Sequence, residues 1–177
     1  MSDNKTLQKL NIRSFSNRDF TGEDQARKFT APINPESFTK NFKVEHDVRR
    51  GHGNHGTEVN FKSTAPEELR LEFILDGTGT MEGYVEEYRK LSVHDQLQKF
   101  LQCSYDFDGN IHRPRFLIIF WGSEIDFRCV LSNLDINYTL FNPDGTPLRC
   151  KLTATFLNFL AKEERLARER QNSPDLT

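Results

Sequence analysis

Apolar and polar residues alternate from Leu134 to Phe156, and this alternation is the clearest structural signal in the chain. The alternating apolar positions of its two halves are Leu134, Ile136, Tyr138 and Leu140, and then Leu148, Cys150, Leu152, Ala154 and Phe156. A period of two is typical of strands with one buried face and one wet face. Between the halves, Pro143 presets φ for a turn and Gly145 tolerates a positive φ. The pattern therefore predicts an antiparallel hairpin.

Similar patterns predict further strands before this hairpin. The expected strands are a short one at Leu10 and Ile12, an extended segment at 28–33, Thr39 to Val48, a strand at Val59 and Phe61, Leu69 to Leu75, Arg115 to Trp121, and Ile125 to Leu131. The run that ends at Trp121 is continuously apolar, which indicates a strand covered on both faces. The glycine-rich segment from Gly51 to Gly56 separates two of the strands, so we expect a long hairpin with a flexible tip.

One buried helix is predicted after Ser92. Ser92 is a good N-cap residue, and Asp95 stands three positions later, as in a capping box. The apolar residues on one helical face are Val93, Leu97, Phe100 and Leu101. Turn-forming residues after Tyr105 predict the end of this helix. The charged segment 161–177 suits a short, exposed C-terminal helix.

Together these elements predict a mainly β domain of the α+β type. Roughly eight strands and one buried helix favour a β-barrel or a pair of sheets with one flanking helix. The 177 residues suffice for one domain, in which hydrophobic residues make up 36% and charged residues 28%. We place this domain at residues 1–160 and a charged C-terminal helix or linker at 161–177.

Charge and cysteine content exclude several classes of partner. The net charge of −2, from 24 basic and 26 acidic residues, provides no global field to hold nucleic acid or an anionic membrane. The three cysteines form no C-x-x-C pair, and their odd number fits a reducing compartment. The N-terminus lacks the apolar core of a signal peptide, and the longest apolar run is too short to span a membrane. We expect production in the bacterial cytoplasm, without a nucleic-acid partner or direct membrane insertion.

Histidine is the residue type that comes nearest to suggesting a metal site. The five histidines are His46, His52, His55, His94 and His112. His52 and His55 are close in sequence, but they lie in the glycine-rich segment with no cysteine nearby. A zinc site needs three or four ligands held in tetrahedral geometry. We therefore expect no metal, and a small metal-dependent hydrolase remains the alternative from another class of function.

No other motif indicates catalysis or a cofactor. The segment from Asp76 to Thr80 is rich in glycine but lacks the spacing and the lysine of a phosphate-binding loop. Cys129 and Cys150 fall on apolar strand faces, where cysteine usually behaves as a small hydrophobic residue. The sequence predicts a protein that is not an enzyme and holds no cofactor.

The long hairpin around the glycine-rich segment predicts self-association. A two-stranded hairpin that stands alone is marginally stable, and its open edges pair readily with other chains. Arg49, Arg50, His52 and His55 lie at its tip and are the candidate residues of an assembly interface. Ordinary exposed charge is the simpler explanation for the two arginines.

Several phrases in order resemble one protein family. They are Ile33 to Phe38 (INPESF), Pro66 to Leu69 (PEEL), Phe73 to Gly79, Tyr105 to Gly109, Ile111 to Pro114 (IHRP), Trp121-Gly122, Tyr138 to Arg149 (YTLFNPDGTPLR) and Ser173 to Thr177 (SPDLT). In this order they resemble the tube-like domain of tube-initiator, or tube-adaptor, proteins of contractile injection systems, which are phage-tail-like machines. The resemblance covers the chain from Asn34 onward.

This resemblance implies a phage tail-tube fold, which is a β-barrel-like pair of sheets with a flanking helix. It implies a structural role in which copies form a hexameric ring with an open lumen and strands continue from one subunit to the next. The ring would join the central spike to the inner tube at the baseplate and initiate tube assembly. The implied partners are further copies, the inner-tube protein, the spike protein and other baseplate proteins. The particle would be cytoplasmic, membrane-anchored or released.

Two further alternatives stay open beside this function. The chain is either the tube adaptor or the main inner-tube subunit of the same machine, and a secreted effector carried in the lumen is the third possibility. Members of the family usually continue after S-P-D-L-T into a LysM-type domain, whereas this chain stops at Thr177. Baseplate contact through such a domain is therefore not expected of these residues.

Overall fold

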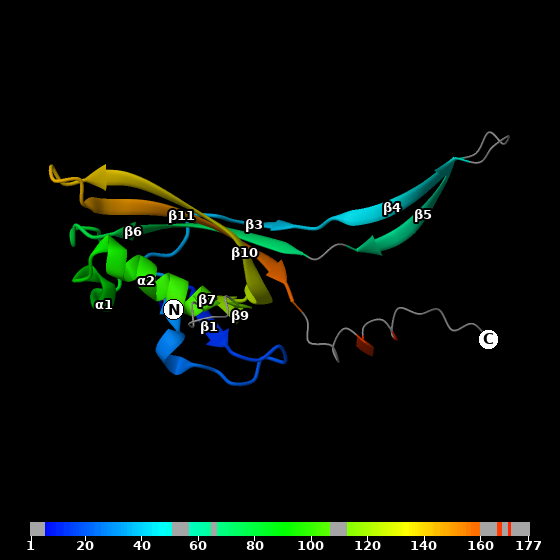
Figure 1. Ribbon diagram of the computed structural model, residues 1–177, viewed down its shortest axis with the longest axis horizontal. Helices are drawn as coiled ribbons and strands as arrows, with labels where there is room; N and C mark the ends of the chain where they lie inside the picture. Colours follow the sequence, from blue (N-terminus) through cyan, green and yellow to red (C-terminus); the bar gives the residue numbers. More distant parts are fainter. Residues whose placement is uncertain are drawn as a thin grey trace, which may run out of the picture.

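The computed structural model describes residues 6–50, 57–64, 67–106, 113–159, 166–167 and 170. The elements in chain order are β1 (Asn11–Phe15), the 3-10 helix η1 (Gln25–Arg27), β2 (Phe29–Thr30), β3 (Phe38–Asn41), β4 (Val44–Arg50), β5 (Thr57–Thr64), β6 (Glu68–Asp76), α1 (Glu86–Arg89), α2 (Val93–Ser104), β7 (Tyr105–Asp106), β8 (Arg113–Pro114), β9 (Phe116–Trp121), β10 (Ile125–Phe141) and β11 (Pro147–Asn158). The long strands form one layer, and α1 and α2 lie against one of its faces (Figure 1).

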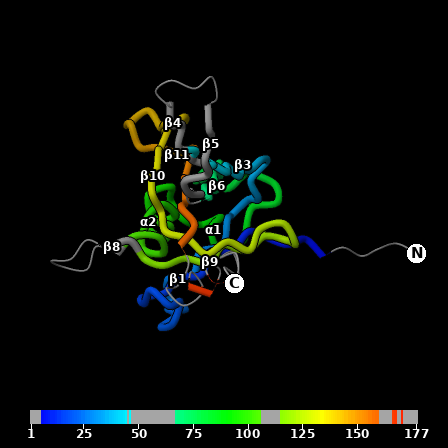
Figure 2. The backbone as a smooth tube through the Cα atoms, turned by 90° about the vertical axis from the view of Figure 1, so that its right-hand side faces the viewer, coloured from blue at the N-terminus to red at the C-terminus, as the bar shows by residue number. Residues whose placement is uncertain are grey.

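The main sheet has seven strands in the order β2-β1-β9-β10-β11-β6-β3, and every neighbouring pair is antiparallel. β10 is 17 residues long and pairs with β9 at its beginning and with β11 along the rest of its length. In the view turned by 90°, β9 and β1 lie below the long strands β10, β11 and β6 (Figure 2). β10 therefore links two halves of a sheet that curls over α2.

The core fills the concave side of this curled sheet. Alternate residues of β6 and β11 are buried there, namely Leu69, Leu71, Phe73, Leu75, Cys150, Leu152, Ala154 and Phe156. Phe29 belongs to β2 at one edge of the sheet, yet its ring centroid lies 6.0 Å from that of Phe73 near the opposite edge. It also lies 5.2 Å from the ring of Phe100 in α2. These contacts require the sheet to curl, because the strands of a flat sheet would hold the two edges far apart.

Contacts between the edge strand β3 and the β9–β10 turn draw the two halves closer. The ring of Phe38 is 6.1 Å from that of Trp121, and the Lys40 Nζ donates a hydrogen bond of 2.8 Å to the Glu124 carbonyl. The Trp121 indole N–H donates to the carbonyl of Gln8 at 3.3 Å. The expectation of a mainly β, barrel-like domain with a flanking helix is confirmed, and its main strands belong to one curled sheet.

Helix α2 begins at the predicted cap and is fixed to the sheet by a buried amide. The Ser92 hydroxyl accepts the Asp95 N–H at 3.1 Å. The Gln96 Nε2 donates to the carbonyl of Asp76 at 2.8 Å, and its Oε1 accepts the hydroxyl proton of Tyr84. Burial raises the pKa of Tyr84, so the phenol stays protonated and can donate this hydrogen bond.

The Asp76 carboxylate is buried at the end of β6 and is held by two neighbours. Its Oδ1 accepts the Thr78 N–H at 2.9 Å, and its Oδ2 accepts the Arg149 Nε at 2.8 Å. Burial by itself would raise the pKa of Asp76, but the hydrogen bonds from Thr78 and Arg149 outweigh it and lower the pKa. The charged carboxylate therefore ties the turn after β6 to strand β11.

Two strand boundaries expected from the sequence are wrong. The segments at 125–131 and 134–141 were expected as separate strands, but they form the single strand β10 with a bulge between Leu131 and Asn133. The bulge accommodates Ser132, whose hydroxyl donates to the Thr155 carbonyl at 3.1 Å. The strand expected at 39–48 is interrupted after Asn41, because β3 follows β6 whereas β4 leaves the main sheet to pair with β5.

The C-terminal part of the chain gives only a partial outcome. Leu166, Ala167 and Arg170 are helical, and the rest of the segment expected as a helix lies outside the described residues. The domain boundary at residue 160 stays a prediction. The short helix α1 was not expected from the sequence, since four residues are too few to show helical periodicity.

Candidate assembly surfaces

The described part of the chain holds no cluster of side chains suited to a metal ion. His46 in β4 and His94 in α2 are exposed and lie on different elements. His52, His55 and His112 lie outside the described residues. No helix in the described ranges has the length and apolar character needed to cross a membrane.

All three cysteines are buried. Burial raises the pKa of Cys103 to about 12 and that of Cys150 to about 11. Burial also raises the pKa of Cys129 well above its usual value. A thiol that stays protonated at neutral pH is a poor nucleophile. The cysteines therefore act as core residues.

An open strand edge runs along most of β10. β9 pairs with β10 only as far as Cys129, whereas β11 accompanies β10 to Phe141. Across the described ranges, no strand pairs with the outer edge of β10 from Val130 to Phe141. An unpaired edge of this length presents a row of free N–H and C=O groups to another chain.

The ladder geometry indicates which residues of β10 face this open edge. The Gly77 N–H donates to Leu148 and the Phe159 N–H donates to Arg128, so even-numbered residues of β11 bond to β6 and odd-numbered residues bond to β10. Bonded and unbonded positions alternate along antiparallel strands. The residues of β10 whose backbone groups point outward are therefore Leu134, Ile136 and Tyr138.

A second open edge lies on β3, on the other side of β11 and β6. β3 pairs with β6, and no other strand within the described residues pairs with it. Because odd-numbered residues of β6 bond to β11, its even-numbered residues Glu68 and Arg70 bond to β3. The partners of these residues are Asn41 and Thr39, so the backbone groups of Lys40 point to the open edge.

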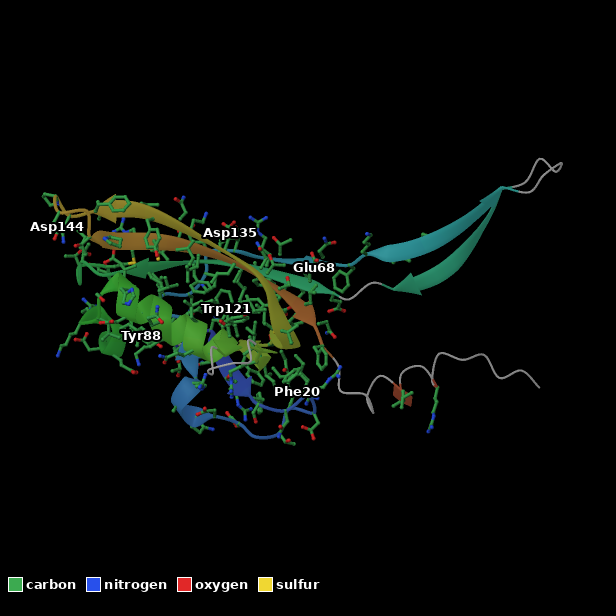
Figure 3. The ribbon with its side chains drawn as sticks, viewed as in Figure 1. Phe20, Glu68, Tyr88, Trp121, Asp135 and Asp144 are labelled. Atoms are coloured by element: carbon green, nitrogen blue, oxygen red, sulfur yellow. The ribbon has the colours of Figure 1, made fainter. Side chains whose placement is uncertain are left out.

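The sheet face opposite α2 is polar between these two edges. Asp135 is paired with Thr153, which is paired with Glu72, so the three residues form one row across β10, β11 and β6. The Lys151 Nζ lies 2.9 Å from the Glu72 carboxylate and lowers the pKa of that group. Figure 3 shows Asp135 on this face, away from the helices. The face is suited to contact with water.

Strands β4 and β5 form an arm that extends away from the main sheet (Figure 1). Their register runs from Val44 opposite Thr64 to Arg50 opposite Thr57, so the predicted long hairpin is confirmed. Arg49 and Arg50, predicted as interface residues, are the last two residues of β4 and lie at the far end of the arm. His52 and His55 lie outside the described residues, so the structure does not bring the four residues together.

Large exposed apolar residues gather at the two ends of the four-stranded part of the sheet. The residues at the β10–β11 hairpin are Tyr138, Leu140 and Phe141, and those at the root of the arm are Phe42 and Val44. Sequence analysis assigned Tyr138 and Leu140 to a buried face, which is wrong, because β9 has already left β10 at this point. The adjacent apolar residues Leu140 and Phe141 break the period of two, which was the available signal.

The comparison with protein families decides between the classes of function considered above. The family model for the contractile injection system tube protein matches residues 6–167. The chain belongs to this family. The family is structural and not enzymatic, which confirms the prediction that the protein is no enzyme. A comparison with curated proteins found no match.

The match gives the open edges of this tube protein a meaning. A tube protein of a contractile injection system assembles with further tube or baseplate components of a phage-tail-like particle. Unpaired strands and exposed apolar ends are a liability in a lone chain, but they are the expected surfaces of a subunit that is buried among neighbours.

Proposed function

We propose that this tube protein forms a closed ring in which the open edge of β10 in one copy pairs with the open edge of β3 in the next. The observation that carries the proposal is the pair of unpaired edges, on β10 and β3, that flank β11 and β6. Pairing them continues the sheet around the ring and leaves no open edge. Full closure is how β-barrels remove the edge liability.

The strand directions support this pairing. Strands β3 and β11 both run antiparallel to β6, and β10 runs antiparallel to β11. β3 and β10 therefore point in opposite directions within one copy. Rotation about an axis that lies along the strands keeps these directions, so β10 would meet the neighbouring β3 as an antiparallel partner. The contact is heterologous and generates a ring when the rotation closes.

We further propose that the ring is hexameric and joins the spike to the inner tube at the baseplate. The support is the ordered set of sequence phrases that resemble tube-initiator proteins, which includes Tyr138 to Arg149 around the β10–β11 turn. The main inner-tube subunit is the second candidate. The exposed apolar residues at both ends of the sheet favour it, because a repeated subunit needs a contact at each end.

Imaging of the purified chain tests the ring. Mass photometry is expected to show a hexamer as the concentration rises, and averaged electron micrographs viewed along the axis are expected to show sixfold rings with an open centre. A protein that stays monomeric at every concentration, or that forms only twofold dimers, would rule out the proposed ring.

We propose that the far end of the β4–β5 arm contacts an adjacent subunit or ring, with Arg49, Arg50, His52 and His55 at the interface. Deleting residues 51–56 and closing β4 to β5 with an Asn-Gly turn is expected to weaken association between rings. The monomer should unfold at an unchanged temperature, because the arm does not pair with the main sheet in the described part of the chain. Sedimentation velocity measures the stacking, and an undiminished stacked fraction would argue against this role of the tip.

A further inference from the structure

We infer that the apolar end of the β10–β11 hairpin docks on the root of the β4–β5 arm of a second copy, so that rings stack head to tail. The inference rests on the proposed ring and adds the contact between rings. The two surfaces are named here the hairpin-end patch, consisting of Tyr138, Leu140 and Phe141, and the arm-root patch, consisting of Phe42 and Val44.

The hairpin-end patch is a group of exposed apolar side chains around a tight turn. The exposed fractions are 42% for Tyr138, 39% for Leu140 and 52% for Phe141. The turn is rigid, because the Asn142 N–H bonds to the Thr146 carbonyl and the Thr146 N–H bonds to the Asp144 carboxylate, both at 2.9 Å. Two neighbouring aromatic rings on a fixed turn expose more apolar surface than a scattered surface residue does.

The arm-root patch lies where the chain passes from β3 into β4. Phe42 is 61% exposed and Val44 is 50% exposed. The root is held in place from below, because Phe38 contacts the ring of Trp121 and Lys40 bonds to the Glu124 carbonyl. The patch is therefore a fixed surface that needs no rearrangement to bind a partner.

The two patches lie at opposite ends of the same sheet. Phe141 is paired with Pro147 at the first residue of β11, and Asn41, just before Phe42, is joined through Glu68 to Leu157 near the last residue of β11. Because β11 has 12 residues, the patches are separated by about 36 Å along the strands. Figure 3 shows the same separation between the labelled Asp144 and Glu68.

A shift along the strands therefore places the hairpin-end patch of one copy against the arm-root patch of the next. Such a contact joins two different surfaces of the same chain and repeats without closing, which is the geometry of a stack or filament. The hairpin-end patch also ends the open edge of β10 at Phe141, so it is continuous with the surface proposed to form the ring.

Charge at the margins of the two patches is complementary. Asp144 is exposed in the hairpin turn, and hydrogen bonds from Thr146 lower its pKa, so it is negative at neutral pH. Lys43 is exposed between Phe42 and Val44 in the arm root. Opposite charges at the rim of an apolar contact favour one partner and one register. A second copy satisfies both the apolar and the charged part of the surface.

Phe42→Ser and Phe141→Ser test the contact, with Leu7→Ser as the matched control. Leu7 is 69% exposed and belongs to neither patch, so its replacement removes a similar apolar group without touching the contact. Rings of each variant are isolated and concentrated, and stacking is measured by sedimentation velocity and negative-stain microscopy. Each patch variant is expected to raise the concentration needed for stacking about tenfold or more, and Leu7→Ser is expected to stack like the unchanged protein.

Mixing the two patch variants gives a sharper result. A Phe42→Ser ring keeps its hairpin-end patch, and a Phe141→Ser ring keeps its arm-root patch. An equimolar mixture of preformed rings should therefore produce pairs of rings that do not extend, whereas neither variant alone should form pairs. Thermal melting of both variants must match the unchanged protein, since the replaced side chains are largely exposed.

The remaining outcomes separate this inference from the proposed ring. Rings whose variants stack normally, or an unchanged protein that forms only single rings at high concentration, overturn the stacking contact and leave the ring intact. An unchanged protein that forms no rings and no longer assemblies overturns both. Pairs of rings in the mixture alone support the head-to-tail contact and favour the main inner-tube subunit over the adaptor.

Discussion

Replacing Lys40 with proline is expected to abolish ring formation while leaving the monomer folded. Along β3, the backbone N–H of Lys40 points to the open edge and not to β6. Proline removes this N–H and adds a ring where the neighbouring β10 would lie. Each interface loses a hydrogen bond worth about 1–2 kcal/mol, and every interface of the ring carries the same defect. Mass photometry is expected to show monomer at concentrations where the unchanged protein is a ring.

Two control variants separate the edge from other effects of this replacement. Lys40→Ala removes the bond from the Lys40 Nζ to the Glu124 carbonyl but keeps the backbone N–H, and it is expected to form rings. Thr39→Pro removes an N–H that bonds within the sheet and should destabilise the monomer by about 1–3 kcal/mol. If Lys40→Pro and Lys40→Ala form rings equally well, the β3 edge is not part of the ring interface.

Replacing Asp76 with asparagine is expected to destabilise the monomer by about 2–3 kcal/mol near neutral pH. The carboxylate is only 1% exposed on its side chain and accepts hydrogen bonds from Arg149 and from the Thr78 backbone. Breaking a buried ion pair leaves polar groups without their partner and costs about 3–5 kcal/mol. The figure expected here is smaller, because Arg149 is 37% exposed and can turn to water. Urea denaturation monitored by circular dichroism measures the difference in the free energy of unfolding.

The pH dependence of this difference identifies the charged carboxylate as its cause. The pKa of Asp76 is lower in the folded protein than in the unfolded chain, so its contribution is fully present above the unfolded pKa and is lost as the pH falls through the folded value. The difference between the unchanged protein and Asp76→Asn should be constant above about pH 5 and shrink below about pH 4. A difference that does not change with pH would mean that shape and not charge accounts for the loss.

Asp144→Asn is the matched control for the Asp76 replacement. Asp144 also accepts the N–H of the residue two positions later, but it is exposed in the hairpin turn. Asparagine can accept the same hydrogen bond, and exposed charges contribute little to stability. The free energy of unfolding should change by less than about 0.5 kcal/mol. An equal loss at both positions would contradict the special role of the buried carboxylate.

Local patterns in the sequence predicted the individual elements well. Alternation at Leu152, Ala154 and Phe156 predicted the buried face of β11, because side chains of a strand point to opposite faces in turn. The cap at Ser92 predicted the first turn of α2, because it satisfies a backbone N–H that no helical partner can reach. These features depend on neighbours within a few residues, so the sequence is sufficient to find them.

The candidate assembly surfaces depended on pairing between distant segments. Tyr138 and Leu140 follow the apolar alternation of their strand, yet both are exposed, because β9 stops accompanying β10 at Cys129. Arg49 and Arg50 were predicted as interface residues from their place in a hairpin tip, which assigns them no partner. Neither open edge was visible in the sequence, since it is the absence of a paired strand and not a residue type.

The sequence by itself therefore determined which segments are strands, where the helix begins, that no recognisable catalytic motif is present, and that the chain resembles a tube protein. Only the tertiary structure decided that the strands form one curled sheet with open edges on β10 and β3. The physical reason is that side-chain periodicity records which face of a strand is buried. Backbone N–H and C=O groups are the same in every residue except proline, so the sequence does not record which strand they pair with.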